Sequence, residues 1–348
     1  MNSSALVRKP ESLDAASARL ALLYYAQGSG GTAYERQLFL CLKDALPIQE
    51  HAIRGPSNWP RWLRTPAAVL DLHRSVRATS SGYDLVIDTL NAALLRRGGT
   101  AKNLVIVHHL DFSTSRHARL YSFLGGYILQ CLRRAGQVVV VSEFWKRYLE
   151  NRGVEKVELI YNPFPLEEFR FPEDELNAFK HRLGLLGKPI IYLGNRTEGK
   201  GVDEAYRTLK GIDAHFIATG KDARLLSCPR TECLSARDYQ LLLKASSLAV
   251  TMSTFDEGWC RNAHEAMLCK TPVVGSGRGG MGELLTKGKQ VLCRRFEQLA
   301  AEVSGLLADP VRRRAQGEEG FAFASRFTLD RFRSAWLRVL EQSAALRS

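Results

Sequence analysis

Short apolar runs alternate with helical stretches along this chain, and the alternation occurs in two series. The first series consists of Leu20–Tyr25, Asp84–Asp88, Asn103–His108 and Gln137–Ser142. The second consists of Pro189–Gly194, Ala214–Gly220, Leu248–Ser253 and Pro272–Ser276. Continuous apolar strands separated by helices are typical of parallel sheets that are covered on both faces. The sequence therefore predicts an α/β fold with two doubly wound, Rossmann-like domains facing each other across a cleft.

The segment Tyr161–Pro165 separates the two series, because its prolines cannot sit in a helix interior. A length of 348 residues suits two domains. We predict an N-terminal domain over residues 1–165 and a C-terminal domain over 166–327. No strand follows the helix predicted at 328–348, so this helix must pack back on an element already built.

Basic charge is concentrated in residues 51–150, which hold 14 Lys and Arg against 6 Asp and Glu in a chain of net charge +13. Such a surplus predicts an anionic partner: a lipid surface, a phosphorylated acceptor or nucleic acid. The clearest predicted helix, 117–134, has an apolar stripe bracketed by arginines. We expect this stripe to pack on the sheet; the alternative is a basic amphipathic helix on an anionic membrane.

The seven cysteines include no Cys-x-x-Cys pair, which argues against a disulfide framework and a thiolate zinc site. No run is long and apolar enough to span a bilayer, and the N-terminus lacks a signal core. We expect a cytoplasmic protein with reduced thiols, at most peripheral on the inner face of the cytoplasmic membrane.

The glycine-rich string Gly28–Ala33 follows the first predicted strand and precedes a helix predicted at Tyr34–Leu46. Gly30 and Gly31 would let the backbone approach a phosphate at a helix N-terminus. The string also fits the dinucleotide fingerprint Gly-x-Gly-x-x-Ala, with Glu50 at the distance of a ribose contact. An NAD(P)-dependent oxidoreductase is therefore one alternative, and a tight turn without a ligand is another.

A second loop, Gly194–Gly201, contains two cations four residues apart. At the carboxyl end of a strand, Arg196 through its planar fork and Lys200 as a point charge can clamp a diphosphate. The alternative is that both side chains are simply solvated.

The third string, Phe255–Ala266, contains two carboxylates eight residues apart, Glu257 and Glu265. On one continuous helix they would differ by about 80°, so they share a face only if Glu257 lies on a loop before the helix. Alternatively, Asn262 and Glu265 form a capping box.

Together these strings resemble the GT-B glycosyltransferases of glycosyltransferase family 4, which are retaining enzymes that use nucleotide sugars. The resemblance is strongest over residues 189–285, where the motifs are Gly194-x-Arg196, Lys200-Gly201, Glu257-x7-Glu265, Thr271–Ser276 and Gly279-Gly280-x-x-Glu283. It is weaker around Gly30-Gly31, Val139–Ser142 and Ile160–Pro163. The family also implies that the final helix crosses back to the first domain.

The resemblance implies a role for each matching residue. Arg196 and Lys200 would hold the donor diphosphate, and Glu265 would bind the ribose. Glu257 and the backbone of the next three residues, Gly258, Trp259 and Cys260, would grip the transferred sugar. Gly30 and Gly31 would let the first domain close on the phosphates.

Family members also place a histidine near the reacting sugar, and Val107–Asp111 fills that place. We favour His109 over His108 as this catalytic residue, and Asp111 is a further candidate. The usual Gly-Phe-Gly-Leu-Pro is replaced here by residues 258–262, so Arg261 could meet an anionic sugar or acceptor.

We therefore predict a retaining, metal-independent transferase of the hexosyltransferase type, with no cofactor besides a UDP- or GDP-linked sugar. The predicted acceptor is a saccharide or lipid-linked hydroxyl in bacterial surface polysaccharide or glycolipid assembly. The basic first half leaves open a glycosyltransferase that acts on modified nucleic-acid bases.

Overall fold

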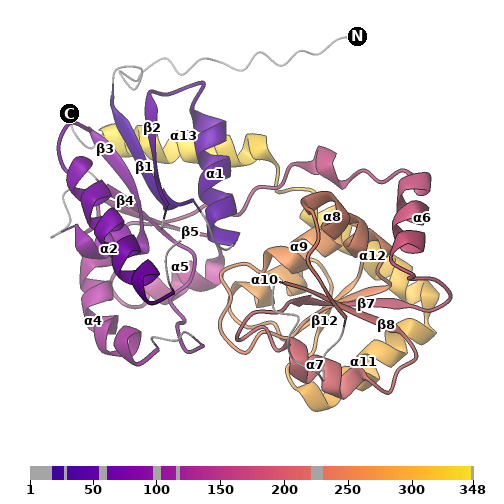
Figure 1. The fold of residues 1–348 in the computed structure, drawn as a ribbon. Helices are drawn as coiled ribbons and strands as arrows, with labels where there is room; N and C mark the ends of the chain where they lie inside the picture. Colours follow the sequence, from indigo (N-terminus) through magenta and orange to yellow (C-terminus); the bar gives the residue numbers. More distant parts are fainter. Residues whose placement is uncertain are drawn as a thin grey trace, which may run out of the picture. The chain divides into compact units, whose positions relative to one another are not determined.

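The protein is described by a computed structural model that covers residues 18–26, 30–54, 61–96, 103–114, 118–220 and 230–345. It contains two six-stranded parallel sheets with helices between their strands (Figure 1). This architecture confirms the predicted α/β class with two doubly wound sheets.

The first sheet has the order β2-β1-β3-β4-β5-β6. Its strands are β1 (Leu20–Tyr25), β2 (Ile48–Ile53), β3 (Leu85–Thr89), β4 (Asn103–Val107), β5 (Gln137–Val140) and β6 (Val157–Leu159). The helices that connect them are α1 (Gly30–Leu42), α2 (Arg61–Ala78), α3 (Leu90–Leu95), α4 (Ala118–Arg134) and α5 (Glu143–Glu150). β1 pairs in parallel with both β2 and β3, so the strand order reverses beside β1, as in doubly wound folds.

The second sheet has the order β12-β11-β10-β7-β8-β9. Its strands are β7 (Ile190–Asn195), β8 (His215–Thr219), β9 (Arg230–Glu232), β10 (Leu248–Thr251), β11 (Val273–Gly275) and β12 (Val291–Leu292). The helices are α6 (Glu173–Arg182), α7 (Val202–Leu209), α8 (Ala236–Ala245), α9 (Arg261–Leu268), α10 (Gly280–Lys287), α11 (Phe296–Ala308) and α12 (Pro310–Ala324), after a 3-10 turn at Leu166–Phe169. Ile191, Leu193, Val250 and Val274 from the central strands are almost fully buried in its core.

The chain divides into two compact units. One comprises Met1–Ile106, Gln130–Val139 and Arg333–Ser348, and the other Val107–Leu129 and Val140–Phe332. The domain limits expected from the sequence, at 165 and 327, stay a prediction.

The final helix, α13 (Leu329–Ala345), packs back on an element already built, as predicted. Trp336 is fully buried and its Nε1–H donates to the hydroxyl of Tyr34 on α1, at 3.2 Å. The two rings also meet edge to face, with centroids 6.4 Å apart. The prediction for α4 is only partly right: Ile128 and Leu132 are buried, but Phe123 is 86% exposed.

Within the described residues, no helix has the length and apolar character needed to cross a bilayer.

Candidate functional site

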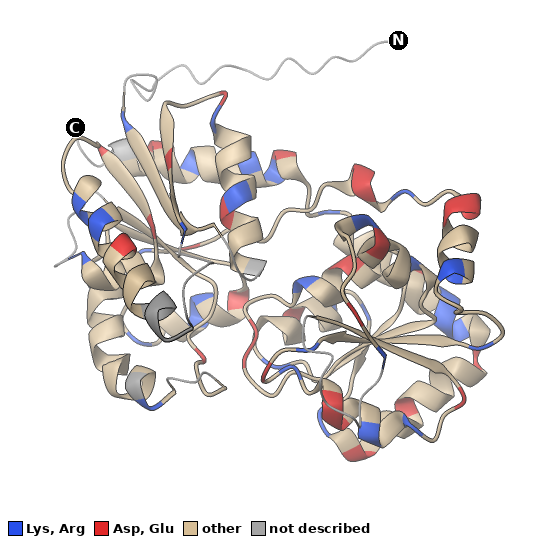
Figure 2. Cartoon of the chain, viewed as in Figure 1, with Lys and Arg blue, Asp and Glu red and all other residues tan. Residues whose placement is uncertain are grey.

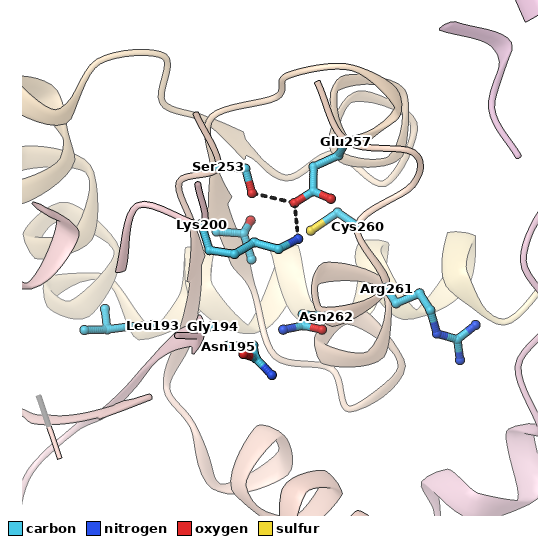
Figure 3. Close-up of a pocket in the computed structure, with 10 residues that line it drawn as sticks. Leu193, Gly194, Asn195, Lys200, Ser253, Glu257, Cys260, Arg261 and Asn262 are labelled. Atoms are coloured by element: carbon cyan, nitrogen blue, oxygen red, sulfur yellow. Dashed lines mark hydrogen bonds and ion pairs between the residues drawn. The ribbon is translucent and has the colours of Figure 1, made fainter. Parts of the chain in front are cut away.

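A pocket opens where β7 and β10 end in the second sheet (Figure 3). The carboxyl ends of parallel strands are where ligands bind in such folds. Its walls are formed by Leu193, Gly194, Asn195, Lys200, Thr251, Ser253, Glu257, Cys260, Arg261 and Asn262. Four residues predicted from the sequence, Lys200, Glu257, Cys260 and Arg261, therefore line one pocket.

Lys200 and Glu257 form an ion pair in this pocket. Lys200 Nζ donates to Glu257 Oε1 at 2.5 Å, and the Ser253 hydroxyl donates to the same oxygen at 2.5 Å (Figure 3). The Glu257 side chain is only 8% exposed. Burial lowers the pKa of Lys200, but the adjacent Glu257 carboxylate outweighs this effect and leaves the pKa raised. The ammonium is therefore charged at neutral pH.

The loop that holds Glu257 is fixed by backbone contacts. The Glu257 carbonyl accepts hydrogen bonds from Trp145 Nε1 at 3.0 Å and from the Gly280 N–H at 2.8 Å. A Cβ at Gly258 would lie 2.5 Å from the carbonyl oxygen of His108, and one at Gly280 would lie 1.9 Å from that of Gly258. Only glycines allow these approaches, because a Cβ at either position would collide with the facing carbonyl oxygen.

Cys260 follows in a left-handed conformation, with φ 63°, directly before α9. Burial, and then the charge of Glu257, raise the pKa of its thiol to about 12. The thiol is therefore protonated at neutral pH and is not a nucleophile.

Glu265 does not form the capping box that Asn262 and Glu265 could have made. Its Oε2 accepts from the hydroxyl of Tyr239 at 2.8 Å, and Arg261 lies 3.3 Å from its Oε1. Burial raises the pKa of the Glu265 carboxyl. Arg261 also stacks over the ring of Phe164 at 4.4 Å. Glu265 is thus held one helical turn from Arg261 and is not among the residues that line the pocket.

Arg196 lies apart from the pocket that contains Lys200. Its Nε is 3.1 Å from Oδ1 of Asp203 on α7, and it lines a separate depression together with Asp203 and Arg207. Asn195, the preceding residue, lines the pocket instead. Successive side chains on an extended chain point to opposite sides, which explains why Asn195 lines the pocket and Arg196 lines the separate depression. Sequence reasoning missed Asn195, although this alternation was the available signal.

His109 is a neutral imidazole of defined tautomer. Its Nδ1 is 3.0 Å from the backbone oxygen of Asp111. Since a carbonyl oxygen can only accept, Nδ1 bears the proton and Nε2 is the acceptor. Burial, followed by the neighbouring His108 and Lys200, lowers the pKa of His109 more than Glu257 raises it. The imidazole ring lies 5.7 Å from that of Phe255.

Asp111 anchors the loop after β4. Its Oδ2 accepts from the Asp256 N–H at 2.7 Å, and its Oδ1 accepts from the Ser113 N–H at 2.9 Å. Burial raises the pKa of this carboxyl, but the bonds from Ser113 and Asp256 outweigh it and leave the pKa lowered. Asp111 therefore joins the His109 loop to the Glu257 loop, and His108 faces Gly258 with its backbone oxygen.

Trp259 does not point into the pocket. Its indole Nε1–H donates to Nδ1 of His264 at 3.0 Å, and His264 Nε2–H donates to the Ala324 carbonyl at 3.1 Å. The His264 ring stacks on Phe164 with centroids 3.9 Å apart. Burial lowers the pKa of His264 to about 3. Sequence reasoning missed this cluster, because nothing in the spacing pairs Trp259 with a histidine five residues later.

Gly30 and Gly31 lie in the other compact unit, where they begin α1. The predicted start of this helix at Tyr34 was wrong, since a glycine pair can occupy the first turn, where the N–H groups are unpaired. Gly28 lies outside the described residues. Glu50, the residue of the oxidoreductase alternative, accepts a hydrogen bond from Tyr24 on the neighbouring strand.

The described residues include no group of three or more His, Cys, Asp and Glu side chains placed to hold a metal ion. Metal independence stays a prediction.

Comparison with known proteins adds two family matches. Residues 16–168 match the model described as Glycosyltransferase Family 4, and residues 231–323 match Glycosyl transferases group 1. An uncharacterized glycosyltransferase of Methanocaldococcus jannaschii is 23% identical over 267 residues, which cover 72% of this chain and 71% of that protein.

Two solved structures share the fold. Sucrose-phosphate synthase of Thermosynechococcus elongatus is 19% identical, with a TM-score of 0.78, over 94% of this chain and 100% of that one. Anabaena HepE in complex with UDP-glucose is 19% identical, with a TM-score of 0.71, over 93% of this chain and 100% of that one.

Proposed function

Because the chain belongs to the family 4 glycosyltransferases with the GT-B fold, we propose that its Lys200–Glu257 pocket binds a nucleotide sugar and transfers the sugar to an acceptor hydroxyl. The observation that supports this proposal is the ion pair itself. A half-buried cation and a buried carboxylate 2.5 Å apart offer one group to a diphosphate and one to sugar hydroxyls. Such paired charges at strand ends belong to a binding site more than to a structural core.

The donor is a UDP- or GDP-linked sugar. HepE, a structural relative, binds UDP-glucose, which makes UDP the first nucleoside diphosphate to test. Asn195 and Asn262 place neutral amides in the same pocket, where they can hydrogen-bond hydroxyl groups of the donor.

Transfer with retention requires that the new bond form on the face from which the phosphate leaves. The bond from the anomeric carbon to the phosphate oxygen breaks, the acceptor oxygen bonds to that carbon, and the acceptor proton passes to the departing phosphate. Lys200 stabilises the charge that develops on the diphosphate. Glu257 binds the sugar, with its Oε1 held by hydrogen bonds from Lys200 and Ser253. His109 presents a neutral imidazole beside these groups.

The acceptor is a saccharide or lipid-linked hydroxyl, as in assembly of surface polysaccharides or glycolipids. The basic surplus of residues 51–150 supports an acceptor that bears phosphate or is held at an anionic surface. The family matches favour neither of the two alternatives from the sequence, an oxidoreductase and a transferase acting on nucleic-acid bases.

A thermal-shift panel of UDP, GDP, ADP, dTDP and NAD tests the proposal, because a ligand of the native state raises apparent stability by mass action. We expect stabilisation by UDP or GDP, lost in Lys200→Ala. The matching nucleotide sugar should then be hydrolysed slowly, and the anomer released, read by NMR, should retain the donor configuration. Stabilisation by NAD alone would overturn the proposal.

A further inference from the structure

Helix α4 exposes an aromatic and basic face that the proposed pocket does not use. Phe123 is 86% exposed and Tyr127 is 44% exposed. Arg119, Arg133 and Arg134 on the same helix are exposed as well. Large exposed apolar side chains that occur together mark a contact with a partner or a membrane.

The positions of these residues define one continuous face. At about 100° per residue, Arg119, Phe123, Tyr127, Gln130 and Arg134 fall within an arc of about 80°. Ile128 and Leu132, which are buried, lie on the opposite side of the helix. The helix therefore has an inner face that packs in the protein and an outer face that is exposed to solvent.

The charge of this helix selects the partner. The α4 sequence contains three arginines and no Asp or Glu, and Figure 2 shows Lys and Arg colour but no Asp or Glu colour along it. An aromatic side chain flanked by arginines suits the interface of a membrane that contains anionic lipids, where the ring enters the headgroup region and the guanidinium groups meet phosphates. We propose that the outer face of α4, formed by Arg119, Phe123, Tyr127 and Arg134, docks on an anionic phospholipid bilayer.

The same helix leads toward the proposed site. Tyr121, in the first turn of α4, stacks on Phe112 with centroids 3.9 Å apart, and Phe112 lies 5.6 Å from the ring of His109. The inner side of α4 is thus joined to the His109 loop by a chain of ring contacts, while the proposed docking face lies on the outer side of the same helix. This step rests on the proposed function and implies that the acceptor hydroxyl is carried by a lipid.

Vesicle sedimentation tests the docking surface directly. Wild-type protein should sediment with vesicles of phosphatidylcholine mixed with phosphatidylglycerol, and far less with phosphatidylcholine alone. Phe123→Asp should weaken binding roughly ten- to a hundredfold, because it removes a buried aromatic contact and adds a like charge to the lipid. Val311→Asp is the control: Val311 is 79% exposed on α12, and the substitution also replaces an exposed apolar side chain with a carboxylate, on another helix.

Three results would overturn the proposal: equal sedimentation with both vesicle types, equal loss in Phe123→Asp and Val311→Asp, or binding that high salt does not weaken. Sedimentation velocity tests whether a second copy of the chain, and not a bilayer, binds this face. Conversion of a wild-type dimer to a monomer by Phe123→Asp would assign the face to that second copy. The nucleotide thermal shift of Phe123→Asp should equal that of wild type. That readout separates failure of the docking proposal from failure of the proposed function.

Discussion

Lys200 and Glu257, 57 residues apart in the chain, meet with Nζ and Oε1 2.5 Å apart in the pocket at the ends of β7 and β10. Lys200→Ala and Glu257→Gln should each lower sugar transfer by roughly a hundred- to a thousandfold, because each removes a fixed group that faces developing charge. Steady-state release of the nucleoside diphosphate measures the effect, with circular dichroism to confirm folding. Lys188→Ala is the control, since Lys188 and Asp213 also form a 2.5 Å pair but are largely exposed. Comparable losses in all three variants would contradict the assignment.

Substitutions of Arg196 and Asp203 should change the affinity for the nucleoside diphosphate in opposite directions. If Arg196 exchanges Asp203 for the donor diphosphate, Arg196→Ala should weaken binding of the nucleoside diphosphate about tenfold. Asp203→Asn should strengthen it, because the competing carboxylate charge is gone. Calorimetric titration of both variants gives the two dissociation constants, and Glu204→Gln, which alters the next residue of the same depression, serves as control. Unchanged affinity in both variants would restrict Arg196 to holding α7.

His264 makes stability depend on pH. Its folded-state pKa of about 3 lies below the ordinary value of 6.5, so the unfolded chain binds a proton that the native protein excludes. The contribution is present above pH 6.5 and falls as the pH drops toward 3. Between pH 7 and pH 5 it amounts to about 2 kcal/mol. Urea unfolding at both pH values gives the free energy of unfolding of wild type and of His264→Asn. The loss between pH 7 and pH 5 should be larger in wild type by that amount. An equal loss in both proteins would show that His264 has no such role.

Two helical glycines should respond oppositely to alanine. Gly280→Ala should destabilise the protein by roughly 1 to 3 kcal/mol, because the new Cβ would overlap the carbonyl of Gly258. Gly305→Ala, on α11 with nothing within 4 Å of the new Cβ, should stabilise it by about 0.5 to 1 kcal/mol. Thermal or urea unfolding compares the two. Donor affinity should fall only in Gly280→Ala, and a Gly280→Ala variant with a free energy of unfolding equal to or above that of wild type would refute the close approach.

The strands that sequence reasoning found and missed divide by their place in the sheets. All eight central strands were predicted, whereas the four missed strands, β2, β6, β9 and β12, are the sheet edges among the described residues. A central strand is buried on both faces and reads as a continuous apolar run. An edge strand has one neighbour and needs fewer apolar residues: Ile48–Ile53 includes Gln49, Glu50 and His51.

The candidate site was predicted to a similar extent. Lys200, Glu257 and Cys260 could be placed because motif spacing fixes them on loops at strand ends. The directions of Arg196 and Trp259 could not, since they depend on where Asp203 and His264 lie after folding. Spacing along a chain determines which loop bears a residue, and packing determines which way its side chain points.

The hydrogen bond from Trp145 Nε1 to the Glu257 carbonyl gives the protein an optical probe of its own. The emission of an indole depends on its hydrogen bonding and on the polarity around it, and Trp145 is almost fully buried. Any shift of the Glu257 loop changes that bond. Occupancy of the pocket can therefore be followed by intrinsic fluorescence in the unlabelled protein, with Trp145→Phe identifying the share of the signal that comes from this contact.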